Sequence, residues 1–317
     1  METLDPREVI RKTTAGTTTQ YDELIITEVL REVERQVREN SVIRNFYRTI
    51  NMPSPTYNLP YQDVRMVVGH VAEGGDISAL YDVPEVKEKT QLVAQKLVAY
   101  STLTSESIDD TVFDLVGFVV SEAVTEIGLA EENAFINGDQ TTYDPSSSTD
   151  ERAICDGILK LCESNTNNVD LTQTPITLNA MNTAMANVET DHYDIADYAW
   201  FMHPKDIATL RGMDEFEHAD KFGGRGSIQS GFQGVVYGIP IISARTIPTN
   251  LGTDTNETVA ILANKRYGWI GQYTGLRAYR FYQQTHDRLE LQWNERLNFV
   301  ISTLNLESHA MVTGIVA

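Results

Sequence analysis

A proline-rich stretch near the N-terminus constrains this chain more than any other feature. Residues Thr49 to Asp63 include Pro53, Pro55 and Pro60. Proline fixes φ and removes a backbone donor, so this stretch cannot form a helix and favours an extended conformation. An extended segment with no core of its own needs another surface to lie on. That surface can belong to a neighbouring copy of the chain.

The following segment, residues 64–104, leads to the same conclusion. Apolar and polar residues alternate at both of its ends, which predicts two strands joined by a polar, glycine-containing tip. An isolated two-stranded hairpin is only marginally stable in water, so this one should rest on a partner. The residues predicted to contact neighbouring copies are Pro53, Pro55, Pro60, Gly74, Gly75, Tyr81 and Pro84.

The strongest helix prediction covers about residues 110–137. Ser107 and the acids that follow it supply an N-cap and a negatively charged first turn. Apolar residues then fall on one stripe until Gly138, where glycine is typical of a helix end. At 1.5 Å per residue such a helix is about 40 Å long. A second helical pattern covers residues 21–47.

The remainder of the chain mixes helices and strands, without an internal repeat and without regular βαβ alternation. This pattern predicts an α+β fold. Helices are predicted at 157–163, 176–191 and 205–210, and strands at 198–204, 234–244, 257–272 and in most of the C-terminal part.

The charge of the chain is strongly negative. Asp and Glu number 45 and Lys and Arg 25, which gives a net charge of −20. Such an excess is typical of proteins in concentrated salt, where screening acts over about 3 Å at 1 M and carboxylates keep the surface hydrated. An ordinary acidic protein is the alternative. Either way, a nucleic-acid groove with clustered cations is disfavoured, whereas a shell that encloses DNA without gripping it is compatible.

Targeting and redox signals are few. No apolar run approaches the roughly 20 residues of a membrane-spanning helix, and the N-terminus has no secretory apolar region. The protein is therefore expected to be made and used in the cytoplasm, or packed into something made there. Cys155 and Cys162 are interpreted as buried apolar residues, too far apart on one helix for a disulfide.

The sequence contains no recognisable catalytic motif, so we expect no enzyme, no cofactor and no metal site. The acidic clusters 191–197 and 215–220 could ligate a cation, but solvated turns are the simpler interpretation. The glycines of 223–226 lack the Lys-Ser/Thr that follows a phosphate-binding loop. His203, before a proline, and the three tryptophans are interpreted as structural.

Five segments, in this order, resemble the major capsid proteins of tailed double-stranded-DNA viruses with the Hong Kong 97-type fold. No single segment is diagnostic, and the resemblance covers most of residues 62–317. The segments are KLVAYSTLTSESIDD (96–110), SEAVTEIGLAEENAFINGD (121–139), YAWFMHPKDIATLRGM (198–213), GVVYGIPIISARTIP (234–248) and LELQWNERLNFVISTLNLESHAMVTG (289–314).

The resemblance implies a layout and a function. Hexamers and pentamers of the chain would form an icosahedral shell around packaged double-stranded DNA, with the loop Gly223, Gly224, Arg225 and Gly226 near the capsomer axis. The implied parts are an N-terminal arm (1–61), an E-loop (62–98), a P domain with a spine helix at about 110–137 (99–160), most of an A domain (161–250) and closing strands (251–317).

The implied partners are further copies of the chain, a separate scaffolding protein, a portal and decoration proteins, with no membrane and no sequence-specific DNA binding. The acidic composition adds the expectation of a virus of a halophilic archaeon. Two alternatives stay open. One is an encapsulin-type nanocompartment shell, against which the long proline-containing arm argues. The other is a soluble α+β enzyme.

Overall fold

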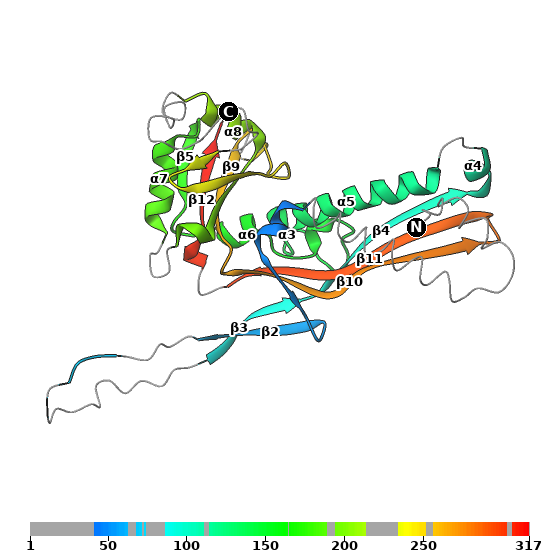
Figure 1. Cartoon of the computed structure of the whole chain (residues 1–317), viewed down its shortest axis with the longest axis horizontal. Coiled ribbons are helices and arrows are strands. Elements are labelled where there is room, and N and C mark those ends of the chain that lie inside the picture. Colours follow the sequence, from blue (N-terminus) through cyan, green and yellow to red (C-terminus); the bar gives the residue numbers. More distant parts are fainter. Residues whose placement is uncertain are drawn as a thin grey trace, which may run out of the picture.

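In the computed structural model, the residues that are described form three sheets, with helices packed on the two larger ones (Figure 1). The mixture of helices and strands confirms the α+β prediction. Most of the helix predicted at 21–47 lies outside the residues that the structure describes. Those residues are 41–62, 68–71, 73, 86–110, 114–163, 165–188, 194–213, 234–251, 256–302 and 306–316.

The four-stranded sheet pairs strands from the beginning and the end of the chain. Its order is β1-β10-β11-β4, with β1 parallel to β10 and the other pairs antiparallel. In β11 the buried residues alternate with half-buried ones, because one face of the sheet packs against helix α5 (Figure 1). The strands are β1 (Arg48–Asn51), β10 (Gly268–Gln283), β11 (Arg288–Ile301) and β4 (Gln95–Thr104).

Helix α5 (Leu115–Asn137) is the predicted long helix, but it begins later than expected. Residues Ser105–Asp110 form a separate short helix, α4, and the carboxylate of Asp114 caps α5 by accepting a hydrogen bond from Gly117 N at 3.0 Å. The predicted stripe is buried at its C-terminal end, where Ile127 and Ala134 enter the core, and only half-buried in the first turns. The predicted start near residue 110 is therefore wrong, because the capping residue that begins the long helix is Asp114.

Gly138 ends α5, as predicted, but for a different reason. Its φ is −58° and its ψ 139°, so it does not adopt the left-handed conformation that usually selects glycine at a helix end. A Cβ at this position would instead run into the backbone oxygens of Cys155 and Ala134. Glycine is needed here because the segment before helix α6 (Ile158–Cys162) crosses the end of α5 very closely.

The six-stranded sheet separates two cores. Residues of β6 (Tyr198–Met202) are all buried and alternate between them: Phe201 faces the core shared with α5, and Trp200 faces the core under α7 and α8. The order is β5-β12-β9-β6-β8-β7. The remaining elements are β5 (Val169–Thr174), β12 (Ala310–Ile315), β9 (Thr258–Asn264), β8 (Ile239–Ser243), β7 (Val235–Val236), α7 (Leu178–Asn187) and α8 (Pro204–Arg211).

The proline-rich stretch is extended, as predicted, but it lies on the chain's own strands. Its first part is β1, and its last part is β2 (Thr56–Gln62), which pairs antiparallel with β3 (Val86–Val93). Pro60 is accommodated at a register irregularity and in a two-stranded sheet, where each strand keeps one free edge. The expectation that this stretch has no surface of its own is therefore wrong for Arg48–Gln62. The hairpin predicted to begin at residue 64 already pairs at Thr56.

Candidate subunit interface

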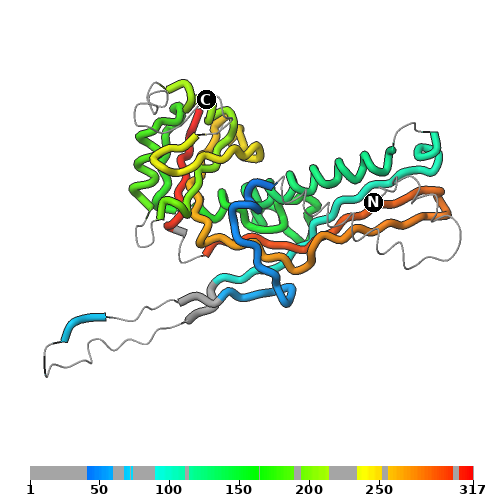
Figure 2. The backbone as a smooth tube through the Cα atoms, viewed as in Figure 1, coloured from blue at the N-terminus to red at the C-terminus, as the bar shows by residue number. Residues whose placement is uncertain are grey.

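The base of the hairpin β2–β3 is anchored on the four-stranded sheet. Met52, Leu92 and Ala94 form a small buried cluster there, against Tyr273 and Val300 of the four-stranded sheet. Asn298 Nδ2 also donates a hydrogen bond to Val93 O at 2.7 Å. Strands β2 and β3 lead away from both larger sheets (Figure 1), and the coloured tube of residues 56–59 and 90–93 in Figure 2 marks where this hairpin begins. A projecting hairpin of this kind has free backbone edges and side chains that do not pack in the core of its own subunit.

The residues predicted to make contacts are only partly placed by the structure. Pro53 and Pro55 lie in the exposed turn between β1 and β2, and Pro60 lies in β2 opposite Glu88. These three prolines are thus brought together at the base and in the first strand of the hairpin. Gly74, Gly75, Tyr81 and Pro84 lie outside the described residues, and so do Gly223, Gly224, Arg225 and Gly226.

The face of the four-stranded sheet opposite α5 carries large exposed apolar side chains that the sequence analysis did not single out. In β4, Val98 and Tyr100 are 44% and 55% exposed, and Tyr100 is paired through Gln292 with Tyr279 of β10. The Tyr279 and Phe281 rings stack with centroids 6.1 Å apart. Aromatic groups gathered on an exposed face mark a surface for interaction rather than a core. We call Val98, Tyr100, Tyr279 and Phe281 the open sheet face.

A buried charged cluster fixes the chain that follows residue 40 to the body. Arg44 lies in helix α3 (Val42–Phe46), and its Nη1 is 2.5 Å from Glu131 Oε1 of α5 and 3.8 Å from Glu295 Oε2 of β11. All three side chains are less than 5% exposed. Tyr47 also holds this segment to the body, through a hydrogen bond between its hydroxyl and the His309 ring at 3.2 Å. Burial raises the pKa of the Tyr47 hydroxyl well above its ordinary value.

Glu132 holds the same region from the neighbouring position of α5. Its carboxylate accepts hydrogen bonds from the Thr246 hydroxyl at 2.9 Å and from Val42 N at 3.4 Å. Burial raises the pKa of Glu132, and these hydrogen bonds together with the positive charge of Arg245 oppose that rise. Two adjacent acids of α5 thus tie α3 and a distant loop to the long helix.

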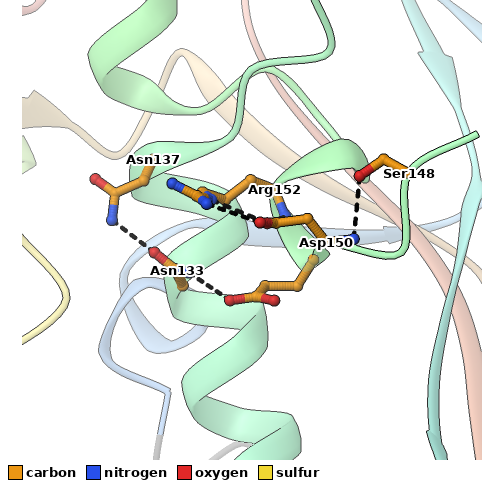
Figure 3. A network of polar contacts seen from close by, with 6 residues as sticks. Asn133, Asn137, Ser148, Asp150 and Arg152 are labelled. Carbon is orange, nitrogen blue, oxygen red and sulfur yellow. Dashed lines mark hydrogen bonds and ion pairs between the residues drawn. The ribbon is translucent and has the colours of Figure 1, made fainter. Parts of the chain in front are cut away.

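The far end of α5 is tied down by a polar network that Figure 3 shows. Asn133 Nδ2 donates to Glu151 Oε1 at 2.6 Å, and Asn137 Nδ2 donates to Asn133 Oδ1 at 2.6 Å. The Arg152 guanidinium donates two hydrogen bonds to the Asp150 carboxylate, of 2.9 and 2.7 Å. The network fixes the loop that crosses the helix end near Gly138.

Within the described residues, no group of three or more His, Cys, Asp or Glu side chains is placed to hold a metal ion. The acidic cluster at 191–197 is described only from residue 194, where Asp194 caps a short helix and Asp197 pairs with Lys265 at 3.0 Å. Residues 215–220 lie outside the described part. His203 accepts a hydrogen bond from Lys205 N and caps α8, which agrees with its structural interpretation.

The cysteines are buried and form no disulfide, as predicted, although only Cys162 lies in a helix. Burial raises the pKa of the Cys162 thiol to about 12. Both thiols therefore stay protonated at neutral pH and belong to the core. None of the described helices is long and apolar enough to span a membrane.

The projecting hairpin and the open sheet face are surfaces through which the chain can contact other molecules. The family comparison identifies the class of protein. The model of the "Phage capsid family" matches residues 23–303, and the chain belongs to this family. It is a major capsid protein, a component of a virion shell.

Solved structures share the fold at low sequence identity. The capsid of a native GTA particle, solved with C5 symmetry, matches with a TM-score of 0.62 at 16% identity, over 87% of this chain and 91% of that one. A structure from Microbacterium phage Oxtober96 matches with a TM-score of 0.64 at 17% identity, over 86% and 90%. The holo-SrpI encapsulin complex from Synechococcus elongatus matches with a lower TM-score of 0.56 at 13% identity, over 98% and 96%. No curated protein matches the sequence.

Proposed function

We propose that this capsid protein assembles as hexamers and pentamers into an icosahedral shell that encloses packaged double-stranded DNA. The observation that carries the proposal is the hairpin β2–β3, which leaves the chain's own core and offers a long limb to neighbours (Figure 1). Contacts at Pro53, Pro55 and Pro60, and at the sequence positions Gly74, Gly75, Tyr81 and Pro84, would each be weak. A closed shell makes many such contacts at once, so weak ones suffice and errors can be corrected during assembly.

The proposed layout follows the family. Residues 1–61 would form the N-terminal arm, and 62–98 the E-loop, although the pairing of β2 from Thr56 argues for an E-loop that begins there. The four-stranded sheet with α5 would be the P domain. The six-stranded sheet, with most of residues 161–250, would be the A domain, with Gly223 to Gly226 near the capsomer axis. The closing strands 251–317 would complete both domains, because β10 and β11 lie in the four-stranded sheet and β9 and β12 in the six-stranded sheet. A separate scaffolding protein, a portal and decoration proteins would complete the particle.

Electron microscopy of particles purified from the native source, or of shells from the expressed chain, tests the proposal. We expect round shells with hexamers and pentamers, and tailed particles containing DNA in the native source. Small shells that contain a cargo enzyme instead of DNA would favour the encapsulin alternative. The similarity to an encapsulin over nearly the whole chain supports this alternative. A chain that stays monomeric at every salt concentration would contradict both proposals.

The acidic composition supports a finer proposal, a virus of a halophilic archaeon. The charge of −20 is then tolerated because concentrated salt screens the repulsion between carboxylates. We expect assembled shells to loosen on dialysis from several molar salt to about 0.01 M, where the screening length grows to about 30 Å. Light scattering measures the loss of particles. Shells that keep their size and amount after dialysis would contradict the saline habitat but not the capsid function.

A further inference from the structure

Asp206 is an acidic residue at a fully buried position, where an acid is rarely found unless it is paired. It lies in the first turn of α8, and its exposed fraction is 0%. Its Oδ1 atom lies 2.9 Å from the hydroxyl of Thr258, the first residue of β9. Its Oδ2 atom has no hydrogen-bond partner among the described residues. An ionised carboxylate that is buried with a single donor is costly, so the site fits a neutral carboxyl group better.

The strands next to Asp206 supply no charge that compensates it. β9 and β12, which are paired at Thr258 and Ile315, contain no charged or titratable side chain. The charges that act on Asp206 belong to His203, which is half-buried, and to Lys205, which is exposed, both at the start of α8. Burial raises the pKa of Asp206, and the hydrogen bond from Thr258 and these two positive charges offset only part of that rise.

The Thr258 hydroxyl has two polar neighbours but only one hydrogen to donate. Besides Asp206 Oδ1, it lies 3.4 Å from the carbonyl oxygen of Ile315, at the end of β12. If Asp206 is ionised, it can only accept, so the Thr258 hydrogen turns to the carboxylate and away from Ile315 O. If Asp206 carries a proton on Oδ1, it donates that proton to Thr258 Oγ1, and the Thr258 hydrogen is available for Ile315 O. A continuous chain of two hydrogen bonds from α8 to β12 therefore exists only in the protonated state.

We propose that Asp206 is a pH-sensitive connection between α8 and the C-terminal strand: its proton links α8 through Thr258 to β12, and its ionisation breaks that link. The inference does not depend on assembly, because all three residues belong to one subunit. The direction of the effect follows from the raised pKa of Asp206. The stabilisation is complete below the ordinary aspartate pKa of 3.8 and is lost as the pH rises through the raised pKa of the folded chain. Acidification should thus strengthen the attachment of α8.

Hydrogen–deuterium exchange of the unassembled, full-length subunit tests the inference. The readout is the protection factor of the amides in α8 and at the end of β12, which corrects for the effect of pH on the chemical exchange rate itself. From about pH 4 to about pH 8, we expect the protection of both segments in the parent chain to fall by about tenfold or more, since one pKa unit is a tenfold change in an equilibrium. In Asp206→Asn, whose amide donates to Thr258 at every pH, protection should change by less than about twofold.

Substitutions of Thr258 test the second hydrogen bond, and they do not require that Asp206→Asn folds. Thr258→Ser keeps the hydroxyl, so both segments should respond to pH as in the parent chain. Thr258→Val removes the hydroxyl with almost the same side-chain shape, so α8 should still respond while the end of β12 no longer follows it. If β12 follows α8 equally in both variants, the connection through Thr258 is overturned.

Two comparisons separate Asp206 from other titrating groups. Glu132 is another buried acid with a raised pKa, but it lies in α5, so Glu132→Gln should leave the response of α8 within about twofold of the parent. His203 acts in the opposite direction, because its protonation removes the ring nitrogen that accepts from Lys205 N. This effect is shared by the parent and Asp206→Asn, and it cancels in their difference. A response of α8 that is flat in the parent, or that persists unchanged in Asp206→Asn, overturns the inference.

Discussion

Replacement of Arg44 by alanine is expected to lower the free energy of unfolding of the subunit by about 3–5 kcal/mol. Arg44 is the cation between Glu131 and Glu295, and all three side chains are almost fully buried. Removing Arg44 leaves the carboxylates of Glu131 and Glu295 without a counter-ion in a region that excludes water. Such an uncompensated buried charge costs much more than replacing the whole ion pair by apolar residues. Urea unfolding of the unassembled subunit, followed by circular dichroism, measures the change.

The ion pair of Arg152 with Asp150 is the matched control for this experiment (Figure 3). Its partners are 2.7 Å apart, but the side chains are 35% and 26% exposed, so water replaces much of what is lost. Arg152→Ala should therefore cost about 1 kcal/mol or less. A triple change of Arg44, Glu131 and Glu295 to methionine should recover most of the stability lost in Arg44→Ala. Equal effects of Arg44→Ala and Arg152→Ala would contradict the conclusion that the buried Arg44 cluster holds α3 to the body of the subunit.

We expect Gly138→Ala to lower the free energy of unfolding of the subunit by about 3 kcal/mol or more, the upper end of the range for overpacked sites. The added Cβ would meet the backbone oxygens of Cys155 and Ala134, and backbone cannot swing away as a flexible side chain does. Either the end of α5 or the segment leading to α6 has to shift, which also disturbs the hydrogen bond from Gly157 N to Gly138 O. The midpoint of thermal unfolding of the subunit reports the loss.

Gly212→Ala is the matched control, since Gly212 also follows a helix. Its φ is −81°, and the nearest atom to an added Cβ is Thr209 O at 3.6 Å, an ordinary contact. This variant should be neutral or slightly stabilising, because alanine has less conformational freedom to lose on folding. Similar losses in the two variants would show that close approach at Gly138 is not what selects glycine there.

Elements with strong local signals could be predicted from the sequence. The apolar run at 198–204 became the buried strand β6, and Pro204 opens α8 at the position where a helix tolerates proline. The strand predicted at 234–244 is present, but a turn at Tyr237 and Gly238 divides it into β7 and β8. In each case the residues that decide the conformation lie within a few positions of one another, so a reading along the chain is enough.

Features that depend on distant residues could not be predicted. Nothing near β1 indicates that it pairs with β10, more than two hundred residues later. Arg44 and Glu131 each resemble a solvated charge on a helix, and only the fold brings them together. The open sheet face had a signal, since Tyr279 and Phe281 are two residues apart and so share one side of a strand. Which side of that strand is left uncovered depends on the position of α5.

The strand order of the two large sheets also has a consequence for synthesis on the ribosome. β4 and β6 emerge early, but their neighbours β11 and β9 come much later, and β12, which lies between β5 and β9, comes last of all. During translation these strand edges wait with their hydrogen-bonding groups free, the situation in which nascent chains aggregate. We therefore expect the host's chaperones to hold this polypeptide until β12 has been made, so that only finished chains become available for assembly.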